Sequence, residues 1–141
     1  MIHVTKVYYP SKEKFKFYVD KIYENGWLTN NGPLVQELEK RLEKYLDVKN
    51  VVLVSGGTVA LQLSYKVLDL NGEVITTPYS FVATTNSLVY SSLKPVFADI
   101  DPETYNLNPA NIEPLINENV SAIVPVHIYG NACEVEKIKD I

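Results

Sequence analysis

The sequence has little cysteine and little arginine, and each shortage excludes a class of protein. Its 141 residues include a single cysteine, Cys133, so an intrachain disulfide and a zinc site built from several cysteines are excluded. We expect Cys133 to fill apolar space rather than to act as a nucleophile. Only one of the 13 basic residues is an arginine and the net charge is −4, a balance that gives no reason to expect a nucleic-acid partner.

Long apolar runs are also missing. No stretch approaches the roughly 18 consecutive apolar residues that a membrane-spanning helix needs. The N-terminal stretch MIHVTKVYYPSKEK lacks the apolar centre of a signal peptide. We therefore expect a soluble, cytoplasmic protein with no membrane partner.

The chain does contain enough apolar sequence for a folded core. Hydrophobic residues make up 46% and charged residues 21% of it, which are ordinary values for a globular protein. Residues 1–48 predict an N-terminal helical segment with two helices, Ser11–Glu24 and Pro33–Leu46, because apolar residues recur at helical spacing in both. A serine and a proline suit the starts of these helices.

Between residues 49 and 141, short apolar runs alternate with helical segments. This order predicts an α/β fold with a mainly parallel sheet and helices on both faces. The expected strands are Val51–Val54, Glu73–Thr76, Pro95–Ala98 and Ala122–Ile128. The expected helices are Thr58–Leu68, Phe81–Ser91, Asn108–Ile116 and one from about Glu134. Pro125 lies inside the last expected strand, although a proline removes a donor from a strand ladder.

The stretch SGGT at residues 55–58 allows two explanations. Backbone N–H groups and the dipole at the start of a helix favour a bound phosphate, and Thr58 adds a hydroxyl donor. Alternatively, the two glycines only allow tight packing. The stretch is not a Walker loop, because no lysine follows the last glycine, and it is not a GxGxxG motif.

Two further motifs place candidate groups at strand ends. In TTPYSFVATTN, Phe81 follows a strand at the carboxyl edge of the sheet, where ligands bind in open α/β folds. Its ring either stacks on a flat ligand or belongs to the core of the next helix. In PVHIYGN, His127 follows the last strand and has either a structural role or a role in the site. Asp99 and Asp101 are interpreted as turn formers that accept backbone N–H bonds, and no metal site is expected.

In their order along the chain, these motifs resemble one family. The order is GWLTNNGP, SGGTVAL, TTPYSFVATTNSLVYSSLKPVFADIDPETYNLNP and PVHIYGN. It is similar to the DegT/DnrJ/EryC1/StrS family of pyridoxal-phosphate-dependent aminotransferases, which act on nucleotide-linked keto sugars. The resemblance implies part of the large domain of a fold-type I transferase over residues 49–141, with pyridoxal phosphate as cofactor. It also implies a nucleotide-sugar substrate, glutamate as amino donor, a homodimer, and a setting in polysaccharide biosynthesis.

The resemblance also assigns residues to the site. The expected cofactor-binding residues are Gly57, Thr58, Val59 and Phe81. The first three match the turn whose backbone amides and hydroxyl hold the cofactor phosphate, and the fourth matches the aromatic residue that stacks on the pyridine ring. The expected substrate-side residues are Thr29, Asn30 and His127.

Two parts that the family needs do not occur in this sequence. One is the acidic residue beside the pyridine nitrogen in an EDAAQA-like motif, and the other is the Schiff-base lysine. In the family both follow the PVHxYG segment. In this sequence, the last expected helix stops on its apolar stripe without a cap. We therefore expect the N-terminal portion of such an enzyme, inactive alone. The resemblance further implies that Val51–Val54 lacks its neighbouring strands here, which leaves its ladder groups unpaired.

Two alternatives to this interpretation stay open. In the first alternative, the chain is a non-catalytic, truncated relative that acts as a binding or partner module. In the second, it is a generic Rossmann-like nucleotide-binding domain. The absence of GxGxxG weakens the second alternative.

Overall fold

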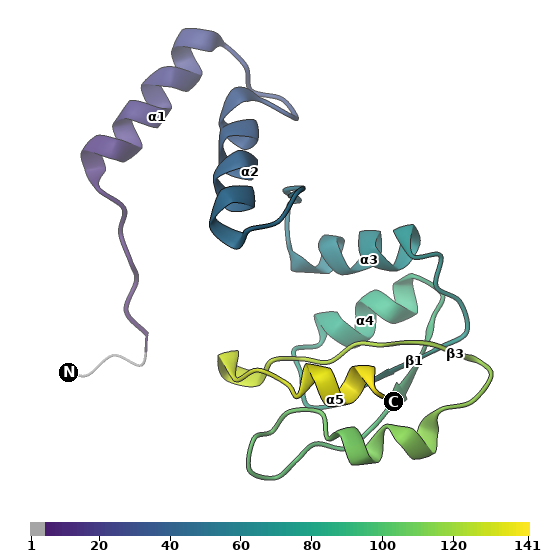
Figure 1. Ribbon diagram of the computed structural model, residues 1–141. Coiled ribbons are helices and arrows are strands. Elements are labelled where there is room, and N and C mark those ends of the chain that lie inside the picture. Colours follow the sequence, from purple (N-terminus) through teal and green to yellow (C-terminus); the bar gives the residue numbers. More distant parts are fainter. Residues whose placement is uncertain (1–4) are drawn as a thin grey trace. The chain divides into compact units, whose positions relative to one another are not determined.

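The computed structural model describes residues 5–141 (Figure 1). The chain forms two compact units that divide between Leu53 and Val54. The expected boundary, between residues 48 and 49, lies earlier in the chain. Each unit is described by itself below.

Unit 1 contains two helices, drawn in purple and blue in Figure 1. α1 spans Lys12–Asn25 and α2 spans Pro33–Leu46, so both expected helices are confirmed. The Ser11 side chain accepts a hydrogen bond from the Lys14 N–H at 3.3 Å and thereby caps α1. Gly26, with a φ of 64°, ends the helix in the left-handed conformation that glycine adopts without strain.

The residues after α2 do not form the expected strand Val51–Val54. The described residues offer this segment no neighbouring strand, and a ladder needs two strands. Its amides bond to α2 instead: Val51 N–H donates to Glu43 Oε1 at 3.2 Å, and Leu53 N–H donates to Glu39 Oε1 at 2.9 Å. The strand prediction is therefore wrong, and two of the backbone groups that were expected to be unpaired have glutamate partners.

Unit 2 is built on a three-stranded parallel sheet with the order β2-β1-β3. β1 spans Glu73–Thr76, β2 spans Lys94–Phe97 and β3 spans Val120–Ile123. β1 lies in the centre and pairs in parallel with both neighbours. The prediction of an α/β fold with a parallel sheet is confirmed.

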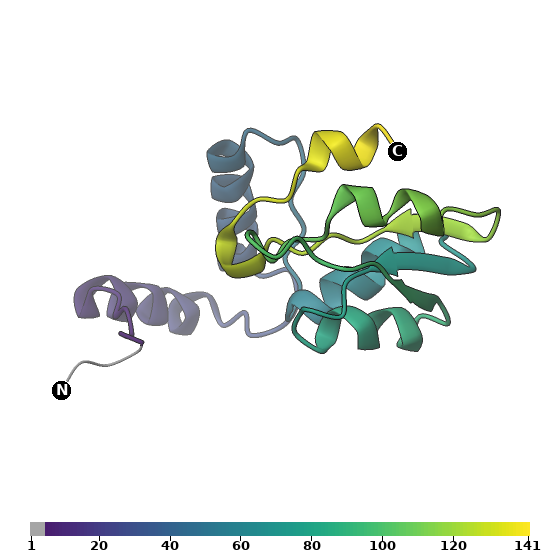
Figure 2. The same ribbon diagram turned by 90° about the horizontal axis from the view of Figure 1, so that it is seen from below.

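Helices and turns cover both faces of this sheet. Val74 and Ile75 are consecutive residues of β1, both fully buried, and they belong to two different core clusters, because successive side chains of a strand point to opposite faces. α3 (Gly57–Val67) and α4 (Ala83–Tyr90) cover the face of Val74. Short helical turns and the last helix cover the face of Ile75, as Figure 2 shows.

In the layer that covers Ile75, the continuous helix expected over Asn108–Ile116 does not form, so that prediction is wrong. The structure has two 3₁₀ turns there, η1 (Pro109–Asn111) and η2 (Glu113–Leu115). Pro114 explains the break, because proline lacks the N–H that a continuous helix needs at this point. The last helix, α5, spans Val135–Lys139.

Prolines and turns also shift two other boundaries. β3 ends at Ile123, two residues before Pro125, so the strand is shorter than expected and the proline removes no ladder donor. α4 begins at Ala83 rather than at Phe81. Phe81 therefore lies in the loop between β1 and α4.

A polar cluster ties the amino ends of the strands together. The Glu73 carboxylate accepts hydrogen bonds from Asn117 Nδ2 at 3.0 Å and from Lys94 Nζ at 2.7 Å. These two bonds hold the pKa of Glu73 below its usual value, because they favour the charged carboxylate.

Candidate functional site

A cavity of about 460 Å³ opens at the carboxyl ends of β1 and β3. It is lined by two loops, Pro78–Phe81 and Val126–Tyr129. The carboxyl ends of adjacent parallel strands meet at one edge of the sheet, which is where open α/β folds bind ligands. The structure thus brings two residues predicted for the site, Phe81 and His127, to the same cavity.

Phe81 presents its ring to solvent at this cavity. Its side chain is 79% exposed, so the alternative explanation, a core residue of the following helix, does not hold. The ring is therefore available to stack on a flat ligand.

A hydrogen bond from a backbone N–H fixes the tautomer of the His127 ring. The Cys133 N–H donates to His127 Nδ1 at 3.0 Å. Nδ1 can accept only through its lone pair, which the neutral ring has when its proton is on Nε2. The other ring nitrogen, Nε2, is then a hydrogen-bond donor on a residue that lines the cavity.

Cys133 itself is a structural residue, as expected. It is buried in the core cluster around Ile75, and its Sγ donates to the Val126 carbonyl at 3.1 Å. Burial raises the pKa of the Cys133 thiol, which disfavours the reactive thiolate.

Three tyrosines lie beside the cavity. The hydroxyls of Tyr79 and Tyr129 are 3.1 Å apart, and the rings of Tyr79 and Tyr105 are stacked with centroids 5.7 Å apart. The hydrogen bond to Tyr129 raises the pKa of Tyr79. Sequence reasoning missed Tyr105 and Tyr129. The only available signal was that Tyr129 follows His127 by two residues at a strand end.

The amino end of α3 offers backbone donors. No side chain among the described residues caps it, and the first bond within the helix runs from Ala60 N–H to Gly56 O. The amides of residues 57–59 are therefore among those that an isolated helix leaves unpaired. A Cβ at Gly56 or Gly57 would meet no atom within 4 Å, so tight packing does not explain these glycines.

Chain topology places this helix end at the same edge of the sheet as Phe81. α3 ends at Val67, and β1 begins at Glu73 after a short connection. α3 therefore runs antiparallel to β1, and its amino end lies toward the carboxyl end of β1. The residues Gly57, Thr58 and Val59 are not among those that line the cavity at Phe81, so the structure provides two neighbouring features rather than one pocket.

The remaining predicted residues lie elsewhere. Thr29 and Asn30 belong to unit 1, in the loop between α1 and α2, where the Asn30 carbonyl accepts a hydrogen bond from Trp27 Nε1 at 3.2 Å. Asp101 Oδ1 accepts the amides of Glu103 and Thr104 at 3.0 and 2.8 Å, which confirms that it forms a turn. Within residues 5–141, no group of three His, Cys, Asp or Glu side chains is arranged to hold a metal ion.

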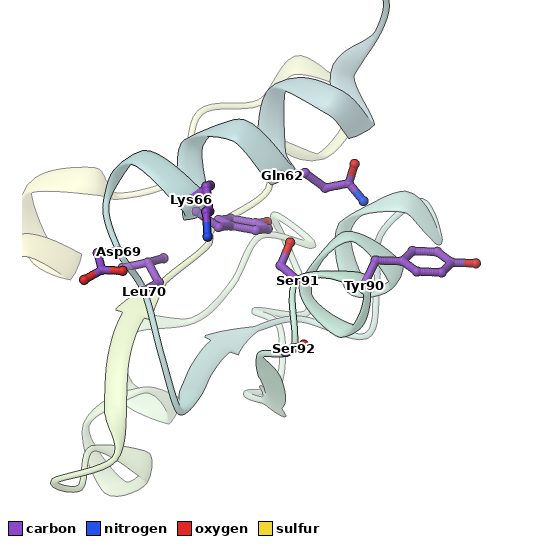
Figure 3. Close-up of a pocket in the computed structure, with 8 residues that line it drawn as sticks. Gln62, Lys66, Asp69, Leu70, Tyr90, Ser91 and Ser92 are labelled. Atoms are coloured by element: carbon purple, nitrogen blue, oxygen red, sulfur yellow. The ribbon is translucent and has the colours of Figure 1, made fainter.

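A second cavity, of about 390 Å³, lies between the carboxyl ends of α3 and α4 (Figure 3). Polar residues line it, including Gln62, Lys66 and Ser91. It contains none of the residues predicted for the site. In the part of the chain that the structure describes, no helix has the length and apolar character to cross a membrane.

Comparison with known proteins gives a family and a set of relatives. The profile of the DegT/DnrJ/EryC1/StrS aminotransferase family matches residues 10–141. Two dTDP-4-amino-4,6-dideoxy-D-glucose transaminases, from Escherichia coli and Shigella dysenteriae, are 46% and 50% identical over 140 residues. The match covers 99% of this chain and 38% of each transaminase, so the chain spans well under half the length of these relatives.

Solved structures agree with the family match. A crystal structure of DesI in the presence of its TDP-sugar product superposes with a TM-score of 0.87 at 35% identity, covering 92% of this chain and 33% of that one. The PLP form of a putative sugar aminotransferase from Streptococcus pneumoniae, Spr1654, superposes with a TM-score of 0.85 at 28% identity, covering 93% and 34%. The expected fold, part of the large domain of a pyridoxal-phosphate-dependent transferase, is confirmed.

Proposed function

Because this chain belongs to the DegT/DnrJ/EryC1/StrS aminotransferase family, we propose that it forms part of the cofactor-binding domain of a sugar aminotransferase. The complete protein uses pyridoxal phosphate. The proposed reaction moves an amino group from glutamate to a keto group of a nucleotide-linked sugar. The names of relatives that act on dTDP- and GDP-linked sugars support this substrate class. The proposed assembly is a cytoplasmic homodimer.

One observation carries the proposal: an exposed aromatic ring and an uncapped helix start share the carboxyl edge of one sheet. Pyridoxal phosphate has a flat ring and a phosphate dianion, so these two features fit its two ends. When bound, the cofactor supplies an electron sink at the reacting carbon. Phe81 lies against the flat ring and excludes water from that face.

The amino end of α3 holds the phosphate in this proposal. The amides of Gly57, Thr58 and Val59 donate to it, the Thr58 hydroxyl adds a donor, and the helix dipole favours its negative charge. The open space at Gly57 leaves room for the phosphate to approach the backbone.

The substrate-side residues remain part of the proposal. His127 donates from Nε2 toward the substrate, and Thr29 and Asn30 are proposed as substrate-side residues from the family resemblance alone. The 141 residues alone do not transaminate, because the lysine motif on which the family depends does not occur among them. Incubation of the purified chain with glutamate and a dTDP-linked keto sugar is expected to give no 2-oxoglutarate.

Titration with pyridoxamine 5′-phosphate tests the binding site. This form has no aldehyde to react with surface lysines, so it reports the pocket alone. In a chain labelled with ¹⁵N and ¹³C we expect saturable shifts of the Gly57, Thr58 and Val59 amides and of the carbon signals of the Phe81 ring. Inorganic phosphate is expected to move the amides of α3 but not the ring.

A matched variant sharpens this test. Thr58→Val keeps the branched shape but removes the hydroxyl, and it should weaken binding by about 1 kcal/mol, or roughly fivefold. Shifts confined to the cavity between the carboxyl ends of α3 and α4 would contradict the proposed site. So would the absence of any shift, and that result would favour a non-catalytic module.

A further inference from the structure

Asn106 is a buried polar residue whose side chain, within residues 5–141, bonds only to the loop after β3. It is 4% exposed. Its Oδ1 accepts from the Ile128 N–H at 3.0 Å, and its Nδ2 donates to the carbonyls of Asn131 and Ala132, both at 3.1 Å. One side chain thus holds both ends of residues 128–132.

The loop that Asn106 holds has an unfavourable backbone. Tyr129 has a φ of 53° and Gly130 a φ of 83°, so two consecutive residues are left-handed. A residue with a side chain persists in this region only where its surroundings fix it, and such residues concentrate at functional sites. The three hydrogen bonds of Asn106 provide that fixation.

The loop in turn fixes His127. His127 directly precedes Ile128, whose N–H donates to Asn106 Oδ1. Cys133 directly follows Ala132, whose carbonyl accepts from Asn106 Nδ2. The Cys133 N–H closes the loop on His127 Nδ1 at 3.0 Å. The geometry of this last bond therefore depends on the separation that Asn106 sets.

We propose that Asn106 is the positioning residue of the cavity: by holding residues 128–132 it keeps His127 in the form with its proton on Nε2, as a hydrogen-bond donor to an oxygen of the ligand. The part that concerns a ligand rests on the proposed function. The part that concerns the imidazole is a property of the protein without ligand. The two parts are tested separately.

The first test needs no ligand. In the uniformly ¹⁵N-labelled chain, we expect a scalar coupling between the Cys133 amide nitrogen and His127 Nδ1 across their hydrogen bond. We also expect ring shifts that report an unprotonated Nδ1 and a protonated Nε2. A protonated Nδ1, or no coupling in a folded chain, would overturn the proposal.

The second test uses two matched variants. Asn106→Asp keeps the size of the side chain and the acceptor for Ile128 but loses the donor to the two carbonyls. We expect it to abolish the coupling and to move both ring nitrogens of His127 toward values averaged over two tautomers. Asn117→Asp makes the same change at the opposite edge of the sheet, where it loses the bond to Glu73. That control should leave the His127 signals unchanged, and equal effects of the two variants would show a merely structural role.

The third test asks whether Asn106 acts through His127. The dissociation constant of dTDP-glucose, a probe for the nucleotide-sugar substrate, is measured with saturating pyridoxamine 5′-phosphate for Asn106→Asp, His127→Gln and the double variant. We expect each single variant to weaken binding roughly 2- to 10-fold, and the double variant to bind no more weakly than His127→Gln alone. Multiplicative losses would overturn the coupling between the two residues. If the wild-type chain binds no pyridoxamine 5′-phosphate, the proposed function fails, and the scalar coupling still decides the role of Asn106.

Discussion

Phe81→Ala separates ligand binding from stability at the candidate site. The side chain is 79% exposed, so little packing is lost, and the free energy of unfolding should change by no more than about 0.5 kcal/mol. Stacking contributes about 0.5–1.5 kcal/mol beyond the area that a ring buries. Because 1.4 kcal/mol corresponds to a factor of ten, the dissociation constant of pyridoxamine 5′-phosphate should rise roughly 2- to 10-fold from stacking alone.

The assay pairs calorimetric titration with urea unfolding. Val82→Ala is the matched control, because Val82 is the next residue, is 59% exposed and does not line the cavity. It should change neither quantity. Phe81→Trp, which keeps a stacking surface, should restore most of the affinity. A loss of 2 kcal/mol or more of stability in Phe81→Ala would refute the reasoning, since it would show that the ring packs in a core. Unchanged affinity would refute the stacking role.

Three further predictions concern the frame that positions the site. Leu88→Ala empties a fully buried position between α4 and the sheet and should cost 2–5 kcal/mol in urea unfolding; a cost below 1 kcal/mol would mean that this layer is loosely packed. Gly72→Ala would place its Cβ 2.5 Å from the Asn119 carbonyl at a φ of 73° and should destabilise the chain by more than about 1 kcal/mol, whereas Gly57→Ala, in open space, should not. For Glu73, whose folded-state pKa is lowered, the stabilisation is present above the unfolded pKa of about 4.3 and is lost as the pH falls through the folded value. The difference in stability between wild type and Glu73→Gln should therefore be seen at pH 7 and vanish in acid, and a difference independent of pH would contradict this.

Elements that depend on local sequence were predictable. α1 and α2 follow from apolar spacing, from Ser11 and from the proline at the start of α2, all of which act within one or two helical turns. The meeting of Phe81 with His127 was also predictable in outline, because parallel strands bring their carboxyl ends together.

Elements that depend on distant partners were not predictable from the pattern. The apolar run Val51–Val54 has the composition of a strand, but strand structure requires a neighbour. The hydroxyl contact of Tyr79 with Tyr129 joins residues 50 positions apart. The hydrogen bond between the Ile128 N–H and the Asn106 side chain spans 22 positions, and it depends on a left-handed turn that no local sequence pattern predicts. Pro114 is a local signal against a continuous helix over residues 108–116, and the two 3₁₀ turns form there instead.

The two glutamates that bond to the segment after α2 have a consequence for self-association. Residues four apart on a helix are about 6 Å apart along its axis, and residues two apart on an extended chain are about 6.6 Å apart. Glu39 and Glu43 therefore match the spacing of the amides of Val51 and Leu53 and replace the carbonyls of an adjacent strand. A segment with both edges exposed can add strands without limit, as in a fibril. Here side chains block one edge, so growth through this segment would stop after a single added strand.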